Sequence, residues 1–350
     1  MTSPSLLSQP VQTAPRRVES NFKRFGIPAL LFLLTMFSTT AVGMRYMHNF
    51  RLGAPPLATD ADILPFEWVI RHLSMLATGL PFSLTLVGIL LTHEFGHYFA
   101  CRYYSVRSTL PYMLPAPSLS GTFGAVIRLQ SSIRLRAALI MIGASGPIAG
   151  FVVALVTTTL GLSWSTYSPV PLVHHVQSPL AILAIHRILA LPLGSTPDVR
   201  LIVPHPVLTA SWIGLLITAL NLIPAGQLDG GHILYAISPT VHRWSSRIVV
   251  FILFALGLWF WAGWVVWGLV LLMPGMRHPK VQDEAPLAKS HLALVPICLG
   301  ILLIAGTFQP FQGYGLVHIL KNLPGRYQKQ QGVTGIERDQ QRDQNKSTSL

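Results

Sequence analysis

Thr92-His93-Glu94-Phe95-Gly96-His97 is the stretch that decides the fold, because it puts three ionisable side chains in an apolar segment long enough to cross a bilayer. On a helix, His93 and His97 project from one face, at a spacing that lets two ring nitrogens bind one zinc ion. Glu94 is then placed to act on a water molecule at that metal. Because such residues are costly at membrane depth, the stretch predicts a metal site inside a spanning helix. Polar residues snorkelling from a helix end are the alternative.

The composition predicts a polytopic, α-helical membrane protein. Apolar residues make up 51% of the chain and charged residues 11%, and the mean hydropathy is +0.51, which is typical of membrane domains. Residues 1–25 are expected to be a polar tail without a cleavable signal peptide. A membrane domain is expected over 26–310, and a polar, disordered tail over 311–350. We predict six spans, at about 26–44, 76–104, 137–162, 206–225, 247–273 and 291–308.

The net charge of +13 predicts a membrane topology, not a nucleic-acid partner. If the N-terminus is cytosolic, most of the 25 lysines and arginines fall on the cytosolic side of the six spans, as the positive-inside rule requires. Both termini are therefore predicted to be cytosolic. Arg102 lies five residues after His97, so the metal site is expected in the cytosolic half of the bilayer.

A third metal ligand is expected from the segment Asn221-Leu222-Ile223-Pro224-Ala225-Gly226-Gln227-Leu228-Asp229-Gly230-Gly231-His232. Pro224 removes a backbone donor and Gly226 loosens the chain, so the fourth span should break here and line a polar cavity. Asp229 is the only acidic residue between Asp198 and Asp283. It is a candidate ligand, and a turn aspartate is the alternative. His232 is either a partner of a ligand or a solvated histidine.

Two further patterns lie between these segments. From Gly121 to Ser131, apolar residues alternate with small and polar residues, which predicts a strand; an amphipathic cytosolic loop is the alternative. Gly143, Gly146 and Gly150 recur at roughly helical spacing, and we assign them to close helix packing rather than to chemistry.

Two other segments are expected at the membrane surface. The run from Leu180 to Leu191 is apolar but too short to span, so it predicts an interfacial helix. Four tryptophans crowd the fifth span and suggest an interfacial aromatic belt: Trp259, Trp261, Trp264 and Trp267.

Together these segments resemble the site-2 proteases, a family of intramembrane zinc metalloproteases. The resemblance covers roughly residues 80–235 and is most similar to the plastid and cyanobacterial branch that lacks a PDZ domain. It implies that His93, His97 and Asp229 bind zinc, that Glu94 is the general base and that Asn221 positions substrate. It also implies a re-entrant β-hairpin at the strand pattern. The resemblance rests on HEFGH (93–97), LPYMLPAP (110–117), GTFGAVIRLQSSI (121–133), GASGPIAG (143–150) and NLIPAGQLDGG (221–231).

The expected function is hydrolysis of peptide bonds in or near the transmembrane segments of other proteins, with Zn²⁺ as the cofactor and the lipid bilayer as the environment. A secondary transporter also uses broken helices and intramembrane carboxylates, but it would usually show a second half that repeats the first. A non-catalytic zinc-binding chaperone or scaffold would have no need of Glu94.

Overall fold

The computed structural model describes residues 22–321, apart from 60–61, 63–64, 173–176, 194–196, 274–277, 282, 284 and 313. The expected tails at 1–25 and 311–350 therefore lie largely outside the described residues. In the described part, four helices are long and apolar enough to cross a membrane: Arg24–Arg51, Leu73–Tyr103, Arg136–Trp164 and Pro239–Trp259. The helical membrane class is confirmed, and two of the six predicted spans are represented by shorter apolar helices.

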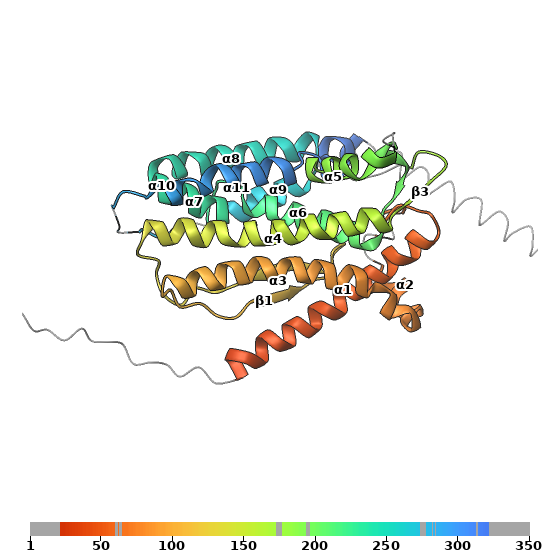
Figure 1. The fold of residues 1–350 in the computed structure, drawn as a ribbon, viewed down its shortest axis with the longest axis horizontal. Helices are drawn as coiled ribbons and strands as arrows, with labels where there is room; N and C mark the ends of the chain where they lie inside the picture. Colours follow the sequence, from red (N-terminus) through yellow and green to blue (C-terminus); the bar gives the residue numbers. More distant parts are fainter. Residues whose placement is uncertain are drawn as a thin grey trace, which may run out of the picture.

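The centre of the bundle consists of α3 (Leu80–Tyr103), α4 (Arg136–Trp164) and α6 (Pro206–Asn221). Figure 1 shows α3 and α4 side by side, with α6 behind α4 and α1 (Ile27–Arg51) on the other side of α3. Large apolar side chains fill the space between these helices, and four of them are at most 1% exposed: Phe82, Leu86, Ile89 and Leu215. This packing makes α3 a rigid carrier for the histidines in its second half.

The two ends of the bundle are named here by the short helices that lie there (Figure 1). α7 (Asp229–Ile237) and α10 (Lys289–Leu292) lie at one end, called the α7 end. α5 (Leu180–Ala190) lies at the other, called the α5 end, together with the small sheet of β3 (Thr166–Tyr167) and β4 (Ile202–Val203). α5 buries one face, including Ile182 and His186, so the segment expected to be a short interfacial helix is confirmed as a helix.

A β-hairpin lies against α1 and α3. β1 (Tyr112–Pro115) pairs antiparallel with β2 (Thr122–Val126), so the predicted strand is confirmed but is shorter than 121–131. Thr122 is 3% exposed and Phe123 is 74% exposed. The face of β2 that carries Thr122 and Gly124 therefore turns inward, up to the exposed Val126 at the end of the strand.

The predicted fifth span, 247–273, is wrong as a single crossing. The structure has two helices, α8 (Pro239–Trp259) and α9 (Gly263–Leu272), and α9 turns back along α8. Gly257 lies so close to Val265 that an added Cβ would meet its Cγ2 atom at 2.4 Å. Two apolar helices that follow one another give the same hydropathy pattern as one long apolar helix. The sequence therefore could not distinguish a single tilted span from the helix pair α8 and α9.

This reversal changes where the described chain ends. After α9, the chain passes the α7 end, where the His291 ring lies 3.2 Å from the Tyr104 hydroxyl, and then follows α11 (Leu294–Ala305). It reaches the α5 end, where Gln177 N donates to Pro310 O at 3.2 Å. α1 also runs toward the α5 end (Figure 1). Pro310 therefore lies at the end of the bundle opposite to the start of α1, whereas the termini that we predicted to be cytosolic lie outside the described residues.

The C-terminal boundary of the membrane domain also needs correction. Phe311 is only 7% exposed and packs against Trp212, with ring centroids 5.5 Å apart. Trp264 is 6% exposed and donates its indole N–H to Phe308 O at 2.8 Å, so it belongs to the interior and not to an aromatic belt. The folded part therefore continues beyond residue 310, and the burial of these aromatic side chains explains why.

The remaining short elements connect the longer helices. α1 is preceded by one turn of π-helix, η1 (Phe22–Gly26), and followed by α2 (Phe66–Arg71) and the 3₁₀ segment η3 (Leu73–Gly79). The 3₁₀ turns η4 (Leu191–Leu193) and η5 (Val199–Leu201) follow α5.

Candidate active site

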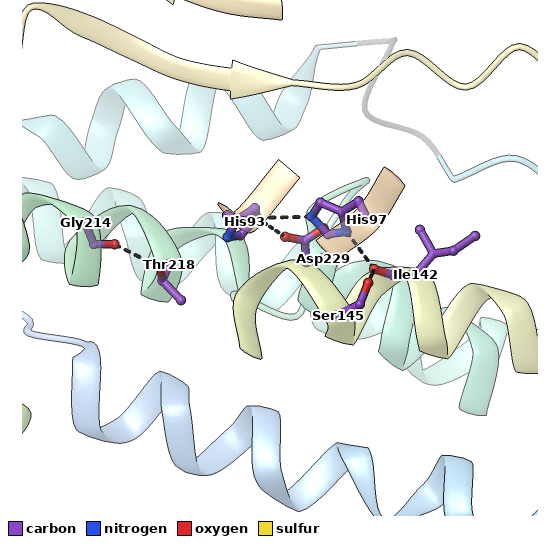
Figure 2. A network of polar contacts seen from close by, with 7 residues as sticks. All are labelled: His93, His97, Ile142, Ser145, Gly214, Thr218 and Asp229. Atoms are coloured by element: carbon purple, nitrogen blue, oxygen red, sulfur yellow. Dashed lines mark hydrogen bonds and ion pairs between the residues drawn. The ribbon is translucent and has the colours of Figure 1, made fainter. Parts of the chain in front are cut away.

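Three side chains from two separate helices converge in the interior (Figure 2). His93 Nε2 lies 3.2 Å from Asp229 Oδ2, and His97 Nε2 lies 3.3 Å from Asp229 Oδ1. The two Nε2 atoms are themselves 3.1 Å apart. His93 and His97 are 4% and 6% exposed, and the Asp229 side chain is 14% exposed. Residues 136 positions apart in the sequence thus form one compact triangle of donor atoms.

The orientation of His97 is set by a backbone group of α4. Its Nδ1 lies 2.6 Å from Ile142 O, and because a carbonyl oxygen can only accept, Nδ1 carries the proton. When the ring is neutral, its Nε2 atom carries the lone pair, which faces His93 and Asp229. Figure 2 shows this contact, with Ser145 donating to the same carbonyl at 3.1 Å. An imidazole held in this tautomer is ready to bind a metal through Nε2.

Gly146 provides the space that the His97 ring occupies. A Cβ atom built on Gly146 would lie 2.2 Å from His97 Nε2, a distance that no side chain can adopt. The glycines of α4 were assigned to helix packing. At Gly146, the side chain that packs against the glycine is His97, a residue of the site. Gly146 therefore allows α3 and α4 to approach closely enough for His97 to reach Ile142.

Asp229 is the first residue of α7, and the break after α6 brings it to the histidines. α6 ends at Asn221, earlier than the predicted 225, and turns lead to α7. Gly230 is tightly enclosed, since an added Cβ would lie 2.0 Å from Leu222 O. The start of α7 thus folds back onto the end of α6. A carboxylate in the first turn of a helix is also stabilised by the free N–H groups there.

Glu94 lies beside the triangle without being part of it. It is 6% exposed, and one carboxylate oxygen lies within 4.8 Å of the ligand atoms of His93 and His97. The carboxylate interacts with the backbone N–H of Ile127, just beyond the end of β2. Glu94 is thus held between the two histidines and the hairpin, within reach of a small molecule bound at the triangle.

The donor set and its spacing fit a zinc ion. Ligand atoms of a four-coordinate zinc site, with bonds of about 2.0–2.1 Å, lie roughly 3.3–3.4 Å apart. The three distances among His93, His97 and Asp229 are 3.1, 3.2 and 3.3 Å. Two imidazoles and one carboxylate are the protein ligands of many catalytic zinc sites, which leave a fourth position open. These three residues could therefore hold the metal.

Two other candidate residues, Asn221 and His232, are not part of the triangle. Asn221 is the last residue of α6 and is half-buried, and its side-chain amide makes no hydrogen bond within the described part of the chain. His232 lies three residues after Asp229 on α7, and its Nδ1 contacts His278 Nε2 at 2.9 Å instead of a residue of the triangle.

Ile142 and Gly146 were not identified as site residues from the sequence. Ile142 acts through its carbonyl, which every residue has, so no side-chain pattern could have found it. The close approach at Gly146 could have been predicted, because GASGPIAG (143–150) places small residues along one helix face. Only the fold reveals that this face lies against the histidines and not against another apolar helix.

Comparisons with known proteins indicate the family to which the chain is similar. The model of peptidase family M50 matches residues 81–260, about half of the chain. A probable zinc metalloprotease, EGY2, chloroplastic, of Oryza sativa subsp. indica is 30% identical over 214 residues, which cover 61% of this chain and 37% of the relative. EGY1, also named a probable zinc metalloprotease, is 31% identical in Arabidopsis thaliana (59% and 39%). In Oryza sativa subsp. japonica, EGY1 is 28% identical (71% and 44%). The chain thus spans less than half the length of these curated relatives.

Proposed function

The chain belongs to peptidase family M50, the site-2 protease family, and on this basis we propose that it is an intramembrane zinc metalloprotease. The observation that carries the proposal is the triangle of His93, His97 and Asp229 with Glu94 beside it. The two histidines and Glu94 lie on α3, a helix apolar enough to span a membrane. A scaffold that only binds zinc would not require a buried carboxylate at this position. Glu94 therefore favours a protease over a non-catalytic zinc protein.

His93, His97 and Asp229 are the proposed ligands, and Glu94 is the proposed general base. Bound zinc would supply a Lewis acid that polarises the scissile carbonyl and lowers the pKa of water. Glu94 accepts the proton of the attacking water and delivers it to the leaving amine. His97 is kept in the productive tautomer by Ile142 O throughout. Asn221, at the end of α6, is proposed to donate its side-chain amide to the substrate backbone.

The substrate is proposed to be a transmembrane segment of another membrane protein, cut within the bilayer or near its surface. Its peptide bonds must leave their helical hydrogen bonds before they can be attacked. An extended substrate could then pair with the edge of the two-stranded hairpin, as strand-addition sites do. The interaction between Ile127 N–H and Glu94 brings the end of this hairpin to the catalytic carboxylate.

The hairpin is proposed to be re-entrant, dipping into the membrane beside α1. Its tip is fixed to α1 by two hydrogen bonds of 2.6 Å, from Ser38 Oγ to Gly121 O and from the Tyr46 hydroxyl to Leu119 O. Both donors lie within the candidate span Arg24–Arg51. Backbone at membrane depth is tolerated when its polar groups are satisfied in this way.

The test is cleavage of single-span membrane peptides by the purified full-length protein, with the products mapped by mass spectrometry. Hydrolysis near or within the apolar segment, lost when a chelator removes zinc and regained with added zinc, supports the proposal. Zinc binding without hydrolysis of any peptide in the panel would favour a scaffold.

A further inference from the structure

A segment remote in sequence crosses the α7 end of the bundle beside the candidate site. Its described residues, 278–281, 283 and 285–288, are called the strap here; they lie between α9 and α10 in the sequence. His278 at its start contacts α7 twice: its Nε2 lies 2.9 Å from His232 Nδ1, and its ring stacks on Tyr235 with centroids 3.8 Å apart and planes at 13°. His232 and Tyr235 are three residues apart on α7, so one imidazole holds one face of that helix.

The middle of the strap is fixed to α4. Arg136 N donates to Asp283 Oδ2 at 3.0 Å, and the Arg136 guanidinium donates to Ala285 O at 3.5 Å. Val281 and Leu287 pack against a buried cluster that includes residues of α4 and α7. α4 is also the helix that orients His97 through Ile142. The strap therefore ties the helix that orients one candidate ligand to the helix that carries another.

The direction of the His232–His278 hydrogen bond follows from the partner groups. His278 Nδ1 lies 2.7 Å from Pro279 O, a carbonyl that can only accept, so Nδ1 carries the proton. Burial lowers the pKa of His278 and of His232 to about 4, so both rings are neutral near pH 7. His278 Nε2 is then the acceptor, and His232 Nδ1 is the donor.

We propose that His278 is a positioning residue that holds α7, and with it Asp229, in the orientation needed to bind zinc. α7 has only nine residues and follows turns, so contacts with other elements must fix its orientation. Asp229 lies one helical turn before His232, and a tilt of α7 would move its carboxylate away from the two Nε2 atoms. The inference depends on the proposed function in one respect: it requires that His93, His97 and Asp229 bind zinc.

The two contacts of His278 can be separated by substitution. His278→Phe keeps a ring to stack on Tyr235 but removes the acceptor for His232, and His278→Gln restores an acceptor without the stacking ring. His278→Ala removes both. Lys280→Ala, at an exposed position two residues further along the strap, is the matched control.

The measurement is the rate at which the purified full-length protein releases zinc to an excess of a coloured chelator. Removing a group that supports a metal ligand typically costs about 10- to 100-fold in metal affinity, so zinc release should be at least tenfold faster from His278→Ala. His278→Phe and His278→Gln should fall between alanine and wild type, and Lys280→Ala should match wild type. The visible absorption spectrum of Co²⁺-substituted protein should shift in His278→Ala, because it reports the geometry of the ligands.

The outcomes separate this inference from the proposed function. A wild-type protein that binds neither zinc nor cobalt contradicts the proposed function itself. Wild-type release and an unchanged cobalt spectrum in His278→Ala overturn the role of His278. If the alanine variant does not fold, His278→Phe and His278→Gln decide: faster release than wild type in either one supports the inference, and wild-type release in both overturns it.

Discussion

At the scale of single residues, the site depends on the small size of Gly146 as well as on its ionisable side chains. Gly146 leaves room for the His97 ring, and Ile142 O fixes the tautomer of that ring. Both belong to α4, which has no acidic or histidine residue in its 29 positions. The helix that shapes the site therefore carries no residue that a search for ligands or catalytic groups would select.

Gly146→Ala should disturb the zinc site, because its Cβ would collide with His97 Nε2. Overpacking of this kind costs about 1–3 kcal/mol, and zinc content should fall together with the melting temperature. Gly88→Ala on α3 is the control, since nothing lies within 4 Å of a Cβ at that position. Metal analysis and thermal unfolding in detergent check both. Equal zinc content in the two variants would show that the close approach at Gly146 is not needed.

The proposed ligands lead to a direct prediction for metal content. The wild-type protein should carry about one zinc per chain, and His93→Ala and His97→Ala should each lose it, because two remaining protein ligands hold zinc poorly. Asp229→Asn should bind zinc more weakly, since the amide lacks the negative charge. Elemental analysis of the purified variants provides the measurement. Unchanged stoichiometry in both histidine variants would remove them from the site.

At the scale of elements, the sequence predicted what depends on local pattern. The i, i+4 spacing of the histidines, the break near Pro224 and the alternation around Thr122 each follow from neighbouring residues, and each has its counterpart in α3, the α6–α7 turn and β2. The reversal between α8 and α9 and the approach of His278 to His232 depend on tertiary packing. The periodicity of apolar residues along a segment carries no information on contacts with distant segments, so these contacts could not be predicted.

The hairpin edge gives a prediction about substrate entry. Proline at Val126 or Ile127 removes a backbone donor, so cleavage should fall sharply while zinc content stays intact. The Ile127 variant also loses the N–H that interacts with Glu94, so the Val126 variant reports on substrate docking alone. Cleavage assays with parallel zinc analysis test this. Alanine at the same positions is the control, and proline variants as active as the alanine variants would exclude docking on this segment.

At the scale of the whole molecule, the path of the chain decides which parts face the same side of the membrane. The start of α8 and the strap lie at the α7 end, whereas Gln177 before α5, Pro310 and Tyr314 lie at the α5 end. The six-span prediction placed residues 310–314 with the start of α8. That error came from counting α8 and α9 as one crossing.

Cysteine labelling distinguishes the two paths. Single cysteines at Thr240 in the first turn of α8, at Val170 before α5 and at Gln312 near the end of the described chain occupy exposed positions, while the native Cys101 and Cys298 are buried. Val170 and Gln312 should react with a membrane-impermeant reagent from one side, and Thr240 only from the other. Labelling of Gln312 together with Thr240 would restore the single fifth span.

The measurement that tests the central claim most directly compares wild type with Glu94→Gln for both zinc content and peptide cleavage. Glutamine has nearly the same shape but cannot accept the proton of the attacking water, so the variant should fold, keep its zinc and lose hydrolysis by about 10²–10⁴-fold. This result would place Glu94 in catalysis and not in metal binding. Cleavage close to the wild-type rate by a zinc-loaded Glu94→Gln protein would contradict the proposed mechanism.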